Sequence, residues 1–238
     1  MSGRLALITG ASRGIGQAAA VAMAKAGHHV VLIARTVGGL EETDDAVRAA
    51  GGSATLVPVD LKDFAALDRL GASIFERWGR LDAFFGNAGL LGALSPLAHL
   101  EPKLFEDLMA VNVTANWRLI RSLDPLLRRA EAGRVLFASS SVARKPRPFW
   151  GGYAASKAAL ECLAITYAAE CADTNIRVNI LNPGATRTAM RARVMPGEDP
   201  NTLPTPDDIA PLIVAMLSPE WTGNGELANF REWKRASG

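Results

Sequence analysis

The sequence has little of what builds disulfides or metal sites: its 238 residues include two cysteines and three histidines. Cys162 and Cys171 are nine positions apart in an apolar stretch of helical composition, which puts them on nearly opposite faces of a straight helix. We therefore predict no disulfide and no metal site, and interpret both cysteines as packing residues of a cytoplasmic protein. The histidines His28, His29 and His99 show no catalytic or metal-binding spacing.

Long hydrophobic runs and an excess of one charge sign are also missing. No apolar run approaches the roughly 18 residues that a membrane span needs, and the start of the chain lacks the long apolar region of a signal peptide. The formal charge of +2 argues against a nucleic-acid protein, which would carry a concentrated basic face. We expect neither membrane nor nucleic acid as a partner.

What is present is a large apolar fraction, 49% of the residues, arranged in alternating strand-like and helix-like stretches. Continuous apolar strands that alternate with helices predict an α/β fold with a parallel sheet covered on both faces. No linker or repeat interrupts the pattern, so we predict one domain over residues 1–238. The expected strands are 5–9, 30–34, 54–59, 81–85, 134–139 and 176–181, and the expected helices are 15–26, 41–50, 63–78, 101–130, one that carries Tyr153, and 206–217.

Residues 190–206 depart from this alternation. They contain four prolines and a glycine, which disfavour a long regular helix across them. A loop of this kind beside a parallel sheet is often a substrate lid. The alternative is an ordered surface connection.

A glycine-rich turn follows the first predicted strand and opens the first predicted helix. Gly10, Gly14 and Gly16 allow a tight turn and the close approach of backbone to a pyrophosphate, which the helix N-terminus then favours. The spacing is Gly-x-x-x-Gly-x-Gly and not the commoner Gly-x-Gly-x-x-Gly. In this strand–turn–helix context it predicts a dinucleotide site, with a plain turn as the alternative. The other residues of this turn that we expect to bind the cofactor are Ser12, Arg13 and Ile15.

The end of the second predicted strand bears on the choice of cofactor. An NAD site usually has an acid there to hold the ribose 2′-hydroxyl, whereas this chain has Arg35. A guanidinium pairs with a phosphate, and Arg13 can reach the same corner, so we predict NADP(H), with NAD(H) as the alternative. Two later strand ends fit the same site, namely Asp60 with Leu61, and Asn87 with Ala88 and Gly89.

Tyr153 and Lys157 are four positions apart and therefore lie on one face of a helix. An ammonium close to a phenol favours the phenolate, so we expect Lys157 to lower the pKa of Tyr153 from its ordinary value near ~10. The pair is typical of an acid/base device if a cofactor site and a substrate site meet it. The alternative is a surface pair without function.

Taken together, these residues resemble the short-chain dehydrogenase/reductase family over essentially the whole chain. The motifs occur in the family's order and spacing: 9–16, Asp60, 87–89, Asn112, 139–141, Tyr153 with Lys157, and 182–184. The resemblance implies a Rossmann-type, doubly wound fold with a seven-stranded parallel sheet. It also implies hydride transfer between a nicotinamide cofactor and a carbonyl or alcohol. The segment 182–206 is most similar to a bacterial subgroup of substrate-unassigned oxidoreductases.

The resemblance implies a role for each matched residue. Tyr153 gives the proton to the carbonyl oxygen, and Lys157 tunes Tyr153 and holds the nicotinamide ribose. Asn112 positions a water that links Lys157 to solvent, and a serine orients the substrate oxygen. Thr188 binds the carboxamide of the nicotinamide. The same strand end contributes Pro183, Gly184 and Thr186 to the cofactor site.

The choice of serine and two departures from the family pattern remain open. The spacing to Tyr153 favours Ser140, with Ser141 as the rival, and leaves Ser139 to the strand end. Gly86 replaces an asparagine that, in the family, often precedes the motif at 87–89. We expect this glycine to loosen the strand end without removing the site. The glycine-rich signature after the last strand is not recognisable, which leaves that strand in doubt.

The sequence does not select a substrate. The cations and aromatics of 144–150 and 187–193 suit an acidic group with an apolar body, although a solvated rim or subunit contacts are the simpler interpretation. The alternatives to an enzyme of this kind are a non-catalytic NADP-binding sensor or regulatory protein and, less well matched, a nucleoside-dependent methyltransferase. We expect a homodimer or homotetramer, because the helices around Asn112 and after Tyr153 carry more apolar positions than one stripe needs.

Overall fold

The computed structural model describes residues 3–237 and contains a seven-stranded parallel sheet with the strand order β3-β2-β1-β4-β5-β6-β7. Each neighbouring pair of strands is parallel. This confirms the predicted fold class, a doubly wound α/β sandwich. The strands are β1 Leu5–Thr9, β2 His29–Ala34, β3 Ser53–Pro58, β4 Ala83–Gly86, β5 Arg134–Ala138, β6 Arg177–Asn182 and β7 Leu227–Asn229.

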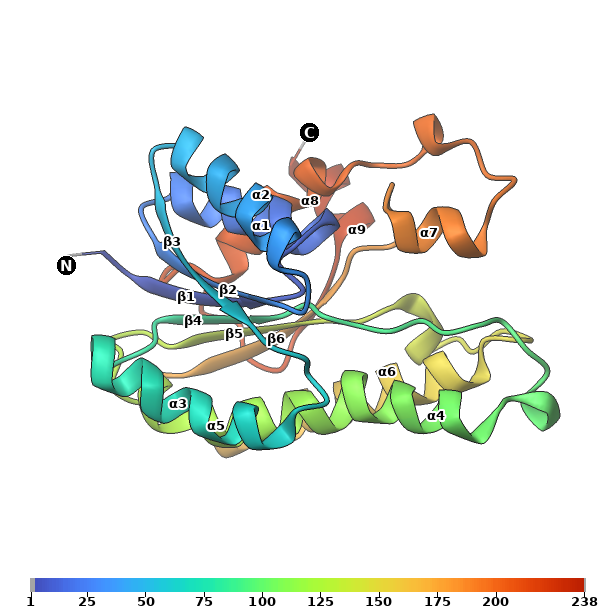
Figure 1. Cartoon of the computed structure of the whole chain (residues 1–238), viewed down its shortest axis with the longest axis horizontal. Helices are drawn as coiled ribbons and strands as arrows, with labels where there is room; N and C mark the ends of the chain where they lie inside the picture. Colours follow the sequence, from blue (N-terminus) through green and yellow to red (C-terminus); the bar gives the residue numbers. More distant parts are fainter. Residues whose placement is uncertain (1–2, 238) are drawn as a thin grey trace.

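Helices cover both faces of the sheet (Figure 1). One layer contains α1 Gly14–Lys25, α2 Val37–Ala49, α8 Pro206–Met216 and α9 Phe230–Ser237, and the other contains α3 Phe64–Trp78, α5 Ala115–Leu127 and α6 Gly151–Glu170. Within residues 3–237, no helix combines the length and apolarity that crossing a bilayer requires.

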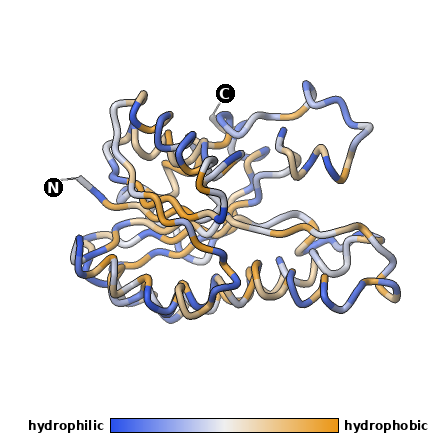
Figure 2. Tube along the Cα trace, in the orientation of Figure 1, coloured by the Kyte–Doolittle hydropathy of each residue, from blue (hydrophilic) through white to orange (hydrophobic). Residues whose placement is uncertain are grey.

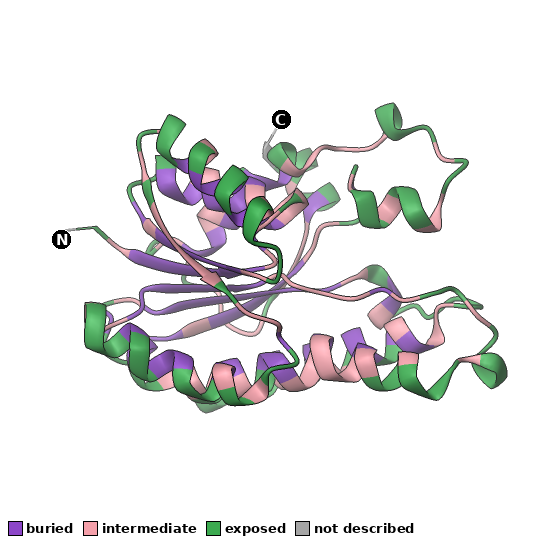
Figure 3. Cartoon of the chain, viewed as in Figure 1, coloured by how far each residue is buried: buried purple, intermediate pink, exposed green. Residues whose placement is uncertain are grey.

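The sheet separates two hydrophobic cores, because successive side chains of a strand point to opposite faces. In β1, Leu5 and Leu7 pack on the α3, α5 and α6 side, whereas Ala6 and Ile8 pack on the α1, α2 and α8 side. The central strands are accordingly apolar along their whole length (Figure 2) and buried on both faces (Figure 3). Burial on both faces is the reason that these strands are continuous apolar runs in the sequence.

Local signals fix where several helices begin and end. The Asp63 carboxylate accepts a hydrogen bond from the backbone of Ala66 and caps α3, which ends at Gly79 in the left-handed conformation. Thr205 and Asp208 form a reciprocal capping box at the start of α8, where Pro206 occupies the first turn. These caps explain why both helices match their predicted ranges closely.

Three regions differ from the sequence-based expectations. The predicted helix over 101–130 is divided into α4, Pro102–Met109, a π-helical turn, Ala110–Thr114, and α5. Segment 190–206 contains a short helix, α7 Ala189–Val194, and a 3-10 turn, Pro200–Thr202. The C-terminal β7 and α9 had no counterpart among the elements predicted from the pattern. The packing role expected for Cys162 is also wrong, because this side chain is exposed, whereas Cys171 is buried.

The strand order reverses between β1 and β4, which defines the switch point of the sheet. The chain runs from β1 through β2 to β3 on one side and resumes with β4 on the other side of β1. Ligands of open α/β sheets bind outside the carboxyl ends of the strands at such a point. At this end of the sheet, α4 and α7 extend beyond the strands on opposite sides (Figure 1).

Candidate functional site

The glycine turn between β1 and α1 has a conformation that only glycine adopts without strain. Gly10 and Gly14 have φ of 67° and 59°, and a Cβ on Gly16 would lie 2.2 Å from the Gly10 carbonyl oxygen. No side chain caps the N-terminus of α1, whose N-cap residue is Arg13. The first backbone N–H groups of this helix are therefore available to an anionic ligand, as a pyrophosphate site requires.

The end of β4 forms the wall beside this turn. The Asn87 side-chain amide donates to the Thr9 carbonyl at 3.0 Å, and the Thr9 hydroxyl accepts from the backbone of Asn87 and Ala88 at 3.1 Å each. A Cβ on Gly10 would lie 2.9 Å from the Ala88 Cα atom, so the two strand ends are in close contact. The structure therefore uses Asn87 to brace the glycine turn.

Gly86 does not loosen this strand end, contrary to the expectation from sequence. It belongs to β4 and pairs with Phe137 of β5. A Cβ at this position would lie 2.5 Å from the Phe137 ring and 2.8 Å from the Asn116 side-chain oxygen. The space that a larger residue would fill is already occupied.

A cation lies at the corner where the 2′ position of a cofactor ribose is expected. Arg35 follows β2, and one guanidinium nitrogen lies 3.8 Å from an Asp60 carboxylate oxygen. Both side chains are well exposed, and Arg13 is exposed as well. Exposed pairs at this separation contribute little stability, so the Arg35 guanidinium remains available to a phosphate. Leu61, next to Asp60, is buried.

The segment after β6 reaches the glycine turn from the other side. Gly184 has φ of 72°, and its backbone N–H donates to the Asn182 side-chain oxygen at 3.1 Å. Thr186 is buried, whereas the Thr188 hydroxyl caps α7. A Cβ on Gly14 would lie 3.6 Å from the Thr188 methyl group, which brings this strand end against the turn.

Tyr153 on α6 is partly buried and hydrogen-bonded to Ser140, the residue that opens the 3-10 turn Ser141–Ala143 after β5. Ser141 is exposed and is not the serine that meets the phenol. Burial raises the pKa of Tyr153 to about 12, and the hydrogen bond with Ser140 lowers it in part. The phenol is therefore protonated at neutral pH.

Lys157 is buried one turn further along α6. Its ammonium donates to the Ala138 carbonyl at 2.8 Å and lies 5.8 Å from the centre of the Tyr153 ring. Burial lowers the pKa of Lys157 to about 8, and the Glu161 carboxylate acts in the opposite direction. The expectation that Lys157 lowers the pKa of Tyr153 is thus wrong for this structure, because desolvation of the phenol dominates and the opposing effect comes from Ser140.

Asn112 is fully buried in the π-helical turn between α4 and α5. Its side-chain oxygen accepts from Leu90 N–H at 2.7 Å, and its amide donates to the Leu90 carbonyl at 2.8 Å and to the Ser156 hydroxyl at 2.9 Å. Asn112 thereby joins the segment after β4 to the helix of Tyr153. Irregular π turns often occur at functional sites because they redirect one side chain.

The structure also shows contacts around the site that the sequence analysis did not predict. Ser139 is buried and donates to Glu161, and the Trp150 ring lies 6.2 Å from the Tyr153 ring. Glu161 is four positions after Lys157 on the same helix, so the sequence spacing alone could have predicted that the two side chains are neighbours.

Several cations considered for an acidic substrate are engaged by the protein itself. Arg144 binds Glu161, Arg187 donates to the Pro200 carbonyl, and Arg191 forms a two-point ion pair with Glu198. These contacts within the chain favour the simpler interpretation of a rim over a site for an acidic substrate. No group of three or more potential metal-binding side chains occurs in the described part of the chain.

Comparisons with known proteins agree with this geometry. The family model described as short chain dehydrogenase matches residues 4–199. The uncharacterized oxidoreductase YciK of Escherichia coli is 40% identical over 220 residues, covering 91% of this chain and 87% of the relative. A putative short chain dehydrogenase from Shigella flexneri, solved in complex with NADP, is 38% identical with a TM-score of 0.92, over 96% of this chain and 97% of that one.

Another relative is described by a different cofactor. The uncharacterized NAD-dependent oxidoreductase MT0715 of Mycobacterium tuberculosis is 37% identical over 204 residues, covering 80% of this chain and 74% of the relative. The shared element of these descriptions is a nicotinamide cofactor in an oxidoreductase. On the family match and these identities, the chain belongs to the short-chain dehydrogenase family of nicotinamide-dependent oxidoreductases.

Proposed function

We propose that the protein transfers a hydride between NADP(H) and a carbonyl or alcohol substrate, with Tyr153 as the general acid and base. The observation that carries this proposal is the Ser140–Tyr153 hydrogen bond beside the buried Lys157. A Cβ on Gly89 would lie 3.4 Å from the Lys157 ammonium, so this cluster adjoins the strand end that braces the glycine turn. Acid/base groups and a dinucleotide cradle thus meet at one edge of the sheet.

The residues at that edge fit a dinucleotide. A Cβ would fill the cradle at Gly10 and Gly16, and the N-terminus of α1 offers unpaired N–H groups. When bound, the nicotinamide supplies or accepts the hydride. The residues proposed to hold the cofactor are Gly10, Ser12, Arg13, Gly14, Ile15, Gly16, Arg35, Asp60, Leu61, Asn87, Ala88, Gly89, Tyr153, Lys157, Pro183, Gly184, Thr186 and Thr188.

The preference for NADP(H) over NAD(H) rests on the corner at β2. Arg35 stands where an NAD site commonly places an acid, and its guanidinium is largely exposed. A guanidinium binds a phosphate through two parallel, charge-assisted hydrogen bonds, and a neutral ribose hydroxyl does not offer this geometry or charge. The Shigella flexneri structure with NADP supports this choice by similarity alone.

The protein groups have separate tasks in carbonyl reduction. Tyr153 holds a proton at neutral pH and donates it to the substrate oxygen, while the Ser140 hydroxyl donates a hydrogen bond to the same oxygen as negative charge develops. Lys157 is predominantly charged at pH 7, fixes the end of β5 through the Ala138 carbonyl, and is positioned to hold the cofactor ribose. Asn112 braces the site, because its side chain forms hydrogen bonds with the Leu90 backbone and the Ser156 hydroxyl.

The test combines binding with turnover. NADPH titration followed by fluorescence is expected to show binding, and S-adenosylmethionine is expected not to bind. A panel of carbonyl substrates with NADPH and NADH then identifies turnover. Tyr153→Phe is expected to bind NADPH within about twofold of wild type and to lose at least ~100-fold in kcat, the usual scale of a general acid. Equal turnover in this variant refutes the role of Tyr153, and binding without any turnover in wild type favours the sensor alternative.

We further propose that the chain is a homo-oligomer and that 190–206 is a substrate lid. Trp117 on α5 and Ile165 on α6 are 41% and 44% exposed, which supports a contact between copies of the chain. The segment 190–206 reaches beyond the carboxyl ends of the strands, on the side of the sheet where α1 and α8 lie (Figure 1). Light scattering of the purified protein measures the assembly state, and a monomer at micromolar concentration contradicts the first proposal.

A further inference from the structure

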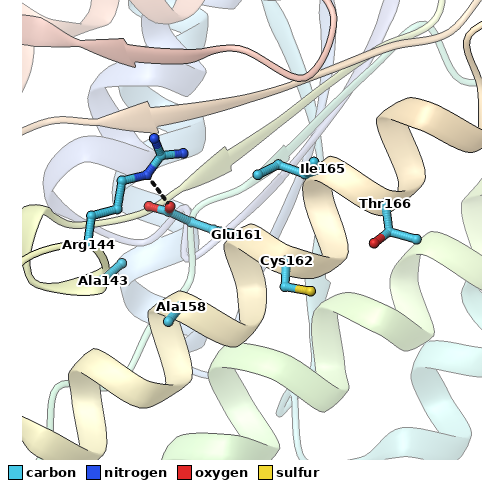
Figure 4. Close-up of a pocket in the computed structure, with 7 residues that line it drawn as sticks. All are labelled: Ala143, Arg144, Ala158, Glu161, Cys162, Ile165 and Thr166. Carbon is cyan, nitrogen blue, oxygen red and sulfur yellow. Dashed lines mark hydrogen bonds and ion pairs between the residues drawn. The ribbon is translucent and has the colours of Figure 1, made fainter.

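A buried carboxylate lies directly behind the proposed site. Glu161 follows Lys157 by one turn of α6, and its side chain is 7% exposed. A charge in this position is costly unless it is paired and hydrogen-bonded. Glu161 has two such partners. The Ser139 hydroxyl donates to one carboxylate oxygen at 2.5 Å. Arg144 Nε donates to the other at 2.7 Å, the contact drawn as a dashed line in Figure 4.

The two partners stand on either side of Ser140 in the chain. Ser139 is the first residue after β5, and Arg144 follows the 3-10 turn Ser141–Ala143. One carboxylate on α6 therefore ties both ends of the segment 139–144, and that segment holds the hydroxyl that meets Tyr153. Because Tyr153 is also on α6, Glu161 fixes the position of Ser140 relative to the phenol.

Glu161 also acts on Lys157 through its charge. Its carboxylate raises the pKa of Lys157 against the lowering that burial produces. The polar groups that face Lys157 are the Ala138 carbonyl of β5, the Tyr153 ring and Glu161 of α6, and the Asn112 side chain, whose oxygen shares the surroundings of Gly89 with the ammonium. Arg144 and Ser139 face the carboxylate itself. Among these neighbours, Glu161 is the acid that keeps the ammonium charged.

We propose that Glu161 is a positioning residue of the site, which anchors the segment of Ser140 to α6 and sustains the positive charge of Lys157. The consequence for turnover rests on the proposed function. The electrostatic part does not, because it concerns the protonation of Lys157 in the protein alone. The two parts are therefore tested by separate measurements.

The first measurement is an NMR titration of the lysine side chains, with the Lys157 signal assigned by its loss in Lys157→Met. In Glu161→Gln, which keeps the size and one hydrogen-bond acceptor, we expect Lys157 to titrate lower by about one pH unit, a modest effect for a close opposite charge. Glu161→Asp keeps the charge and is expected to stay near wild type. Glu170→Gln, at the exposed end of the same helix, is the matched control and is expected to show no shift.

A purely structural role predicts a different result. It would lower the melting temperature of Glu161→Gln and leave the titration of Lys157 in place, and that outcome overturns the electrostatic part. A result in which Glu161→Asp shifts as far as Glu161→Gln overturns it as well. If wild type turns over no substrate, the proposed function fails while this titration still decides the role of Glu161.

The second measurement concerns the anchor. Ser139→Ala removes one tie to Glu161 and leaves the charge, so we expect kcat to fall about tenfold or more, the scale of a misplaced hydrogen-bond donor. The titration of Lys157 and the Kd of NADPH are expected to remain within twofold of wild type. Unchanged kcat in both Ser139→Ala and Glu161→Gln overturns the anchoring part. Ser139→Ala also replaces Glu161→Gln in this test if the latter does not fold.

Discussion

Replacing Lys157 with methionine is expected to make the protein more stable at neutral pH and to abolish that advantage at alkaline pH. The lysine is buried, and its pKa is lowered from 10.5 to about 8. Holding the proton at pH 7 therefore costs the native state about 3 kcal/mol relative to the unfolded chain. Methionine has a similar length and no charge, but it loses the hydrogen bond to the Ala138 carbonyl, worth about 1 kcal/mol. The net gain at pH 7 is about 2 kcal/mol.

The sign of the pH dependence follows from the pH at which Lys157 loses its proton in the native and in the unfolded state. Native Lys157 releases its proton near pH 8, whereas the unfolded chain keeps it until 10.5. Between these values the unfolded state binds more protons, so the stability of wild type rises with pH. Lys157→Met lacks this titration. The difference between the two proteins is expected to shrink by about 2 kcal/mol from pH 7 to pH 9.5.

Urea unfolding followed by circular dichroism at pH 7, 8 and 9.5 measures this difference. Lys25→Met is the control, because Lys25 is exposed at the end of α1 and its replacement is expected to leave the difference independent of pH. Parallel stability curves for wild type and Lys157→Met would refute the reasoning, since they would mean that Lys157 has the same pKa in both states. Titration of Tyr153 lies above this range and does not disturb the measurement.

Three further predictions concern the cofactor site and the segment 190–206. Gly16→Ala places a Cβ 2.2 Å from the Gly10 carbonyl oxygen, so we expect a loss of about 2–3 kcal/mol in stability and of NADPH binding, measured by thermal melts and fluorescence; unchanged binding contradicts the cradle. Arg35→Asp is expected to weaken NADPH by about tenfold or more relative to NADH in the same titration, and an unchanged ratio refutes the assigned corner. Glu198→Gln breaks the two-point pair with Arg191 and is expected to speed tryptic cleavage in 190–206 and to raise the substrate KM, with NADPH affinity unchanged. Cleavage at the wild-type rate would show that the pair does not hold the segment.

The sequence allowed the sheet to be predicted because its central strands are buried on both faces. In β1, each of Leu5 to Thr9 is buried, so an uninterrupted apolar run is a reliable signal there. The last strand, β7, has three half-buried residues and includes Asn229, which gives neither an apolar run nor an alternation. Its position depends on pairing with β6, a contact that a local pattern does not encode.

The sequence predicted which side chains come together in the candidate site better than it predicted their pKa values. Spacing alone brought Tyr153 and Lys157 to one helix face, and the structure confirms that arrangement. The pKa of Tyr153 depends on the depth of the phenol, which spacing does not contain, and desolvation reverses the expected direction. Glu161 was missed because its partners, Ser139 and Arg144, come from a segment about 20 residues earlier in the chain.

The π-helical turn at Ala110–Thr114 has a consequence for the rotational phase of the helices on either side of it. One residue advances an α-helix by about 100°, so the extra residue of a π turn sets the angle between the face of α4 and that of α5. Deleting one residue here would allow a continuous α-helix with better hydrogen bonding. It would also rotate the buried stripe of Ala115, Leu119 and Leu123 by about 100° relative to α4 and thus away from the sheet. The irregular turn therefore acts as a phase correction, which lets one helical region serve both the site and the core.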